Sequence, residues 1–187
     1  MLEVSREEET AHQTKPSVII RRRWEGANDV GSTNILLGIS VLSTGLFTGL
    51  LMTVYFFFQR ALRDPSGSEF ALVMQRFLKI TRTHPLNYAM VLTSGFVPIA
   101  VLVMLREHPG SPAFVLTAVG LLAFWCGPVL TSSLVAQPVY GVFMSWEVDA
   151  PPEDWREARD RYFRANVIRG LGSALAFVCF VTALGAG

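Results

Sequence analysis

The sequence predicts an all-α protein, a four-helix transmembrane bundle with amphipathic interfacial helices in the connections between spans one and two and between spans three and four. Of its 187 residues, 51% are hydrophobic and only 17% are charged, whereas about a quarter of the residues of a typical soluble domain are charged. The mean hydropathy is +0.39. A spanning helix needs about 20 predominantly apolar residues, and four such stretches follow one another along the chain, separated by charged segments.

The first residues are polar, and we expect a flexible N-terminal tail over residues 1–33 ahead of a membrane domain over residues 34–187. The tail begins with an acidic cluster, Glu7 to Glu9, rather than with the basic region and apolar core of a cleavable signal peptide. The first membrane helix then serves as an uncleaved targeting signal.

Four spans are predicted, at about residues 34–58, 87–105, 113–138 and 166–184. The first ends in an aromatic cluster typical of the membrane interface, and the second carries Pro98. The third stays uncharged as far as Tyr140, which is too long for a hydrocarbon core of about 30 Å. We therefore expect Gly127-Pro128 to bend it, and Gln137-Pro138 to end it or to make it re-enter the membrane.

The connections after the first and third spans share one design. In the first, Ser66 or Ser68 can cap a helix whose apolar positions recur at three- and four-residue steps. In the second, the prolines and acids of PPEDW begin a helix with an arginine-rich body. We expect both helices to lie at the membrane surface, on one side of the bundle. The arginine count and the polar tail give opposite orientations, so the cytoplasmic side stays open.

Three glycines, Gly38, Gly45 and Gly49, fall on one face of the first span. Small residues at this spacing let helix backbones approach closely. We expect this face to pack inside the bundle, with a homodimer contact or room for a flat ligand as the alternatives.

An ordered polar stripe enters the last span. At 100° per residue, six side chains fall within about 80° of one another on a helix: Trp155, Arg159, Tyr162, Asn166, Arg169 and Ser173. Headgroup anchoring explains the outer part of the stripe. It does not explain Arg169, because an ionisable group at membrane depth must be paired or face a cavity, and the spans contain no Asp or Glu. We interpret Arg169, with Asn166 and Tyr162, as an anion or enolate site that faces an enclosed cavity.

His84 is the one histidine at a predicted membrane boundary beside polar neighbours, Arg82 and Asn87. A histidine poised between protonation states suits a general base or a proton shuttle, and we expect it across the cavity from Arg169. A solvated interfacial loop is the alternative. Three histidines and two cysteines are too few and too scattered for a zinc or haem motif, so we expect neither a metal nor another cofactor.

The chain resembles the anthrone oxygenase family of small four-span integral membrane proteins, many of whose bacterial members were long labelled only as a domain of unknown function. The resemblance covers about residues 38–184. It rests on the glycine-bearing first helix, on a Phe-x-x-x-Met-Gln segment, on a proline at the foot of the third helix and on a Trp, aromatic, Asn, Arg run before the last: Gly45, Gly49, Phe70, Met74, Gln75, Pro138, Trp155, Tyr162, Asn166 and Arg169. Members usually carry an asparagine on either side of that proline, where this chain has Ala136 and Tyr140.

This resemblance implies cofactor-independent oxidation of a polycyclic phenolic substrate, such as an anthrone, by dioxygen in a bacterial cell membrane. The reaction needs a base, donors or positive charge for the developing enolate oxygen, and a dry slot for a flat ring system. His84 is then the predicted base, and Arg169 and Arg82 are the predicted enolate stabilisers. The predicted substrate contacts are Asn166, Tyr162, Trp155, Asn87, Tyr140 and Trp125.

Two other function classes stay open. The polar tail and the missing asparagines favour a non-catalytic membrane subunit or scaffold that docks a partner protein. A transporter for a small organic anion would require the four spans to dimerise. The expected partners are the lipid bilayer, a hydrophobic aromatic substrate, and either a second copy of the chain or a partner membrane protein. A net charge of +1 gives no general attraction to nucleic acid.

Overall fold

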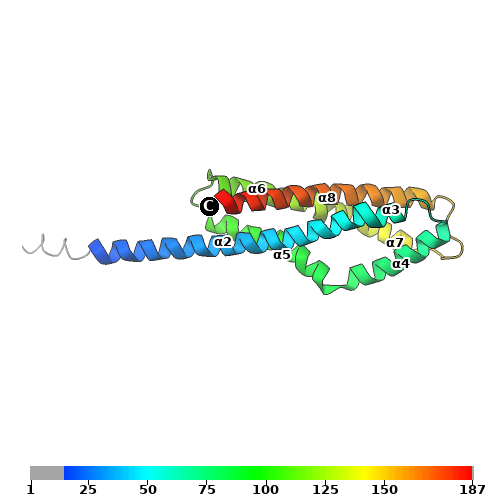
Figure 1. The fold of residues 1–187 in the computed structure, drawn as a ribbon, viewed down its shortest axis with the longest axis horizontal. Coiled ribbons are helices and arrows are strands. Elements are labelled where there is room, and N and C mark those ends of the chain that lie inside the picture. Colours follow the sequence, from blue (N-terminus) through cyan, green and yellow to red (C-terminus); the bar gives the residue numbers. More distant parts are fainter. Residues whose placement is uncertain (1–14, 187) are drawn as a thin grey trace, which may run out of the picture.

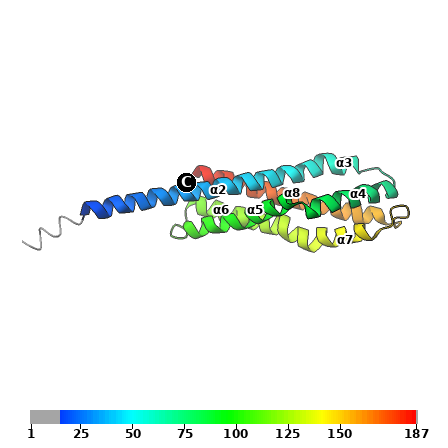
Figure 2. The same ribbon diagram turned by 90° about the horizontal axis from the view of Figure 1, so that it is seen from below.

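The computed structural model describes residues 15–186, and this part of the chain contains helices and no strand. Four helical stretches are long and apolar enough to cross a membrane: Gly31–Ala61, Pro85–Met104, Pro112–Ser145 and Trp155–Ala186. They lie side by side in one elongated bundle (Figures 1 and 2). The predictions of an all-α protein and of four helices able to span a membrane are therefore confirmed.

The outer surface of the bundle is apolar on every one of these stretches. Leu42, Leu92, Leu122 and Leu171, one from each stretch, are 66%, 55%, 64% and 65% exposed. Soluble monomers rarely expose apolar patches of this extent. The surface is that of a protein in contact with lipid.

The first stretch consists of α2 (Lys15–Thr53), a π-helical turn η1 (Val54–Phe58) and α3 (Gln59–Ala61). Residues 15–33, where we expected a flexible tail, thus lie in α2, and residues 1–14 lie outside the described part. Helix α2 extends past the ends of the other helices (Figure 1). Of the three predicted packing glycines, only Gly45 meets a neighbour, the Phe177 ring of α8; a Cβ at Gly38 or Gly49 would have nothing within 4 Å.

Helices α4 (Gly67–Thr83) and α5 (Pro85–Met104) form an elbow beside the bundle (Figure 1). Ser66 caps α4 in a capping box: its hydroxyl accepts from the Glu69 backbone N–H at 3.3 Å, and its own N–H donates to Glu69 Oε2 at 2.9 Å. The elbow falls at His84 because Pro85 has no N–H to continue α4. Buried residues on one face of α4 pack against α7 and α8: Phe70, Met74 and Leu78.

The third stretch is one bent helix made of α6 (Pro112–Phe124), two π-helical segments, η2 (Trp125–Leu130) and η3 (Ser132–Ala136), and α7 (Gln137–Ser145). Proline cannot donate the backbone hydrogen bond that an α-helix needs, and widened π-turns are one way to accommodate the loss. The predicted change at Pro128 is present. The prediction that Gln137-Pro138 ends the helix or makes it re-enter is wrong, because α7 continues to Ser145.

The last stretch is a single helix, α8 (Trp155–Ala186), in which the charged segment and the predicted span are continuous. It touches η2 through two glycines. A Cβ added to Gly127 would lie 2.7 Å from Gly172 Cα, closer than side-chain atoms approach backbone. This backbone contact fixes the distance between the third and fourth stretches next to the site described below. The two long connections lie at one end of the bundle and the α5–α6 turn at the other, as predicted (Figure 2).

Candidate functional site

The polar stripe on α8 faces the interior of the bundle. Trp155, Tyr162, Asn166 and Ser173 are at most 6% exposed. On the opposite face of the same helix, Ile168 and Leu171 are exposed. The 100° spacing of the stripe therefore predicted its direction correctly.

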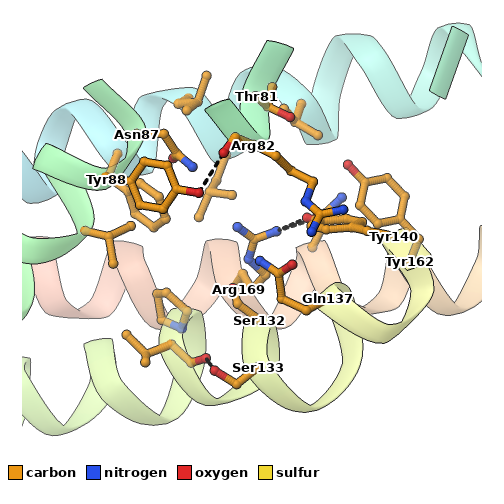
Figure 3. Close-up of a pocket in the computed structure, with 18 of the residues that line it drawn as sticks. Thr81, Arg82, Asn87, Tyr88, Ser132, Ser133, Gln137, Tyr140, Tyr162 and Arg169 are labelled. Atoms are coloured by element: carbon orange, nitrogen blue, oxygen red, sulfur yellow. Dashed lines mark hydrogen bonds between the residues drawn. The ribbon is translucent and has the colours of Figure 1, made fainter. Parts of the chain in front are cut away.

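The inner part of the stripe lines a cavity of about 240 Å³. The cavity lies between α2, the α4–α5 elbow, the third stretch and α8 (Figure 3). One part of its wall is apolar: Phe47, Leu50, Leu51, Val54, Val91 and Val129. The other part carries hydroxyl, amide and guanidinium groups, among them Arg82, Asn87, Gln137, Tyr140, Tyr162, Asn166 and Arg169. The cavity is thus amphipathic, with its charged groups gathered in one region.

Arg169 has no carboxylate partner in this cavity, since none of the lining residues is Asp or Glu. Its Nη1 donates to Asn166 Oδ1 at 2.9 Å and to the Tyr140 hydroxyl at 3.1 Å. Its Nε is buried and has no hydrogen-bond partner among the described residues. Arginine is always charged and offers five N–H donors in a fixed fork. Two neutral acceptors leave the positive charge of this fork uncompensated.

A second unsatisfied donor lies beside it. Asn166 is 1% exposed, and its Nδ2 has no hydrogen-bond partner among the described residues. A buried donor without a partner costs about 1–3 kcal/mol. Because Asn166 accepts from Arg169 through its other amide atom, the two unsatisfied donors belong to one cluster. A bound anion or carbonyl oxygen would satisfy both.

Arg82 enters the cavity from the last turn of α4, on the side opposite α8 (Figure 3). Its backbone is held by Tyr88, whose hydroxyl donates to the Arg82 carbonyl at 2.6 Å across the elbow. Asn87 lines the cavity from the first turn of α5. The structure thus brings two arginines into one cavity from helices that are far apart in the sequence.

His84 is not part of the cavity lining. It caps α5 at the elbow, where its Nδ1 accepts from the Leu86 N–H at 3.3 Å, and its side chain is exposed. The expectation that His84 lies across the cavity from Arg169 is therefore wrong. Arg169 does face a cavity, but this cavity has exposed residues in its lining and is not the enclosed one that we expected. Arg82, which is exposed, is the charged group of the elbow that lines the cavity.

Two predicted aromatic contacts also lie elsewhere. Trp155 packs against Phe70 at 5.2 Å between ring centroids, with the Arg159 guanidinium carbon 5.3 Å from its ring. Trp125 donates its Nε1 proton to the Gly95 carbonyl at 3.2 Å. Neither lines the cavity. Both tryptophans stabilise contacts between helices instead.

The cavity includes polar residues that sequence reasoning missed: Thr81, Tyr88, Ser132, Ser133 and Gln137. Three of them, Ser132, Ser133 and Gln137, belong to η3 or the start of α7. The available signal was the pair of prolines, Pro128 and Pro138, that bracket this segment. Within residues 31–186, no three His, Cys, Asp or Glu side chains gather in a group that could hold a metal ion.

Comparison with protein-family models, with curated proteins and with solved structures gives no match for this chain. The resemblance to the anthrone oxygenases therefore stays a prediction from the sequence. What the chain does has to be argued from the cavity.

Proposed function

We propose that this integral membrane protein binds a small, flat, acidic aromatic compound as its enolate or phenolate, and promotes its cofactor-independent oxygenation by dioxygen. The observation that carries the proposal is the uncompensated Arg169, with its unpaired Nε beside the unpaired Asn166 amide. The reaction is the one that the family resemblance implies. The cavity is the reason for placing this reaction at these residues.

The oxygen anion of such a ligand fits the donor cluster. Preorganised donors in a water-poor site act most strongly on a charge that develops during the reaction. Arg169 and Asn166 offer the buried donors, and Arg82 adds a second positive charge from the other wall. These groups lower the energy of the enolate relative to the neutral substrate.

The apolar wall suits the ring system. Phe47 and Leu51 are buried, and Val129 faces them from η2 within the same lining. Cavities that hold drug-sized ligands measure about 300–1,000 Å³, so a cavity of about 240 Å³ favours a compound smaller than these. A few fused rings meet this description.

The proton acceptor in this proposal is water, in place of the predicted His84. The neutral Tyr140 hydroxyl accepts from Arg169 Nη1 at 3.1 Å and thereby helps to orient the guanidinium. The substrate C–H bond breaks, the proton goes to water, and the electron pair stays on the substrate as the enolate.

Dioxygen is the only oxidant that the reaction needs. The enolate passes one electron to it, and the two radicals combine to a peroxide, which takes a proton back from water. Loss of water then leaves a ketone, so that CH₂ and O₂ become C=O and H₂O.

The α4 helix lies at the membrane interface in this proposal. Its outer face mixes apolar Leu72, Val73 and Ile80 with basic Arg76 and Lys79, all exposed. Such a mixture is typical of a helix that rests among lipid headgroups. We place the protein in a bacterial cell membrane, as the resemblance implies, with the elbow at headgroup level.

The test uses purified protein in liposomes with anthrone as the probe. Arg169→Ala is expected to lower kcat for oxygen uptake by about 10²–10³-fold, the usual effect of removing one oxyanion donor. Arg164→Ala is the matched control, because Arg164 is an exposed arginine on the same helix outside the cavity. Full activity in Arg169→Ala, or no binding and no turnover by the unaltered protein, would refute the proposal.

A further inference from the structure

The mouth of the cavity opens on the lipid-facing side of the bundle. Several lining residues are exposed, and they come from three different spans: Leu50 at 41% and Tyr88 at 56%, with Ser133 and Gln137 also exposed. Side chains in the interior of the same cavity, such as Tyr162 and Asn166, are 1% exposed. The opening therefore leads outward between helices.

The depth of this mouth can be worked out from the first span. The uncharged run of residues 34–58 is centred on Leu46, and Leu50 lies four residues, or about 6 Å, from that centre. With a hydrocarbon core of about 30 Å centred on this run, Leu50 lies about 9 Å inside the hydrocarbon.

The two sides of the mouth differ in polarity. Leu50 and Leu51 belong to the apolar side, and the exposed Arg82 and Gln137 belong to the polar side. The donors of Arg169 and Asn166 that have no partner are buried deeper in the cavity. A ligand that arrives from the bilayer along Leu50 and Leu51 keeps its rings against apolar side chains until its oxygen reaches these donors.

We propose that the gap beside Leu50 is a lateral portal through which a membrane-dissolved acidic compound enters from the lipid. This inference rests on the proposed function and defines its substrate class: a compound that is neutral and apolar enough to partition into the bilayer, and acidic enough to lose a proton beside Arg169. Its ring system passes between α2 and the elbow, and its oxygen reaches the donor cluster last.

Substitutions at the mouth test the portal in liposomes. Leu50→Trp places a large side chain in the opening and is expected to slow the association of anthrone at least tenfold. Leu46→Trp is the matched control, because Leu46 is 56% exposed one turn earlier on α2 and does not line the cavity. Leu50→Ala, which widens the opening, is expected to bind anthrone at least as fast as the unaltered protein.

A second measurement needs no variant. At equal aqueous concentration, anthrone should associate faster with protein in liposomes whose lipid takes up more of the compound, because the rate then follows its concentration in the bilayer. Equal rates for Leu50→Trp and Leu46→Trp, or a rate set by the aqueous concentration, would overturn the portal and leave the proposed function standing. Displacement of anthrone by phosphatidylglycerol would also overturn it, because the cavity would then belong to a lipid headgroup. If the unaltered protein binds no anthrone, the proposed function itself fails.

Discussion

The glycine contact between η2 and α8 makes a sharp prediction about stability. In Gly172→Ala, the new Cβ would lie 2.7 Å from Gly127 Cα and 3.0 Å from the Ala123 carbonyl oxygen. Carbon atoms in contact are normally about 3.5–4.0 Å apart. Both neighbours are backbone atoms, which cannot rotate away, so the two helices must move apart by about 1 Å.

The size of the effect follows from two opposing terms. Overpacking typically costs about 1–3 kcal/mol, and a backbone-to-backbone clash lies at the upper end of this range. Alanine regains about 1 kcal/mol through its higher helix propensity. We therefore expect Gly172→Ala to destabilise the protein by about 2 kcal/mol. Gly49→Ala is the control, because a Cβ there meets nothing within 4 Å.

Unfolding by SDS in mixed micelles, followed by circular dichroism, measures the difference between these two variants. The same displacement should widen the cavity, since Pro128 and Val129 line it from η2, and should weaken anthrone binding. If Gly172→Ala and Gly49→Ala unfold at the same SDS fraction, the close contact between the third and fourth stretches is absent. The cavity beside this contact then does not have the shape described above.

Three further predictions concern α4 and the elbow. Tyr88→Phe removes the hydrogen bond that positions Arg82, so kcat for anthrone should fall by about 2- to 10-fold while KM is retained; an unchanged kcat would contradict this role. Hydrogen bonds from the backbone N–H and hydroxyl of Ser66 lower the pKa of Glu69 below its ordinary value of 4.5. The ionised carboxylate thus stabilises the start of α4 above that pH, and the stabilisation is lost as the pH falls through the lowered pKa. The protection factors of the amides there, which correct exchange rates for the intrinsic effect of pH, should fall in acid, whereas those of Glu69→Gln should not change with pH. Gln75→Leu removes two hydrogen bonds, of 3.0 and 2.9 Å, to carbonyls at the end of α7. We expect it to lower the free energy of unfolding, measured in SDS, by about 1–3 kcal/mol. Gln75→Glu cannot donate these hydrogen bonds and should be no more stable than Gln75→Leu.

The fold could be predicted from apolar length and charge alone, because each membrane span is a long run of uncharged residues in the sequence. The four spans, and the end of the bundle at which the two long connections lie, follow from these runs. The π-helical segments could not be predicted in the same way. Prolines at 128 and 138 indicate a disturbance, but whether the chain bends, stops or widens depends on what packs against it, here Gly172 of α8.

In the candidate site, too, some features could be predicted from the sequence and others could not. Tyr162, Asn166 and Arg169 share one helix, so their common direction depends only on the helical repeat. His84 and Arg82 lie at the elbow, where a change of direction over two residues determines which side chain lines the cavity. The sequence alone did not show which of the two residues this would be. Tyr140 was predicted to contact the substrate, and it lines the cavity. Its hydroxyl also accepts from Arg169 at 3.1 Å, a contact across 29 residues that depends on the course of η3.

A substitution of Arg169, which has no charged partner in the cavity, can distinguish a structural role of this residue from a functional one. A buried charge that holds a fold together costs about 3–5 kcal/mol when its partner is removed. Arg169 has only neutral acceptors, Asn166 and Tyr140, and its replacement by an apolar side chain of similar length removes a desolvated charge at the same time. We therefore expect Arg169→Met to change the free energy of unfolding by less than about 1 kcal/mol while it lowers kcat for anthrone by about 10²–10³-fold, as Arg169→Ala does. A loss of about 3–5 kcal/mol would instead make Arg169 a structural residue, and the charge in the cavity would need no ligand to explain it.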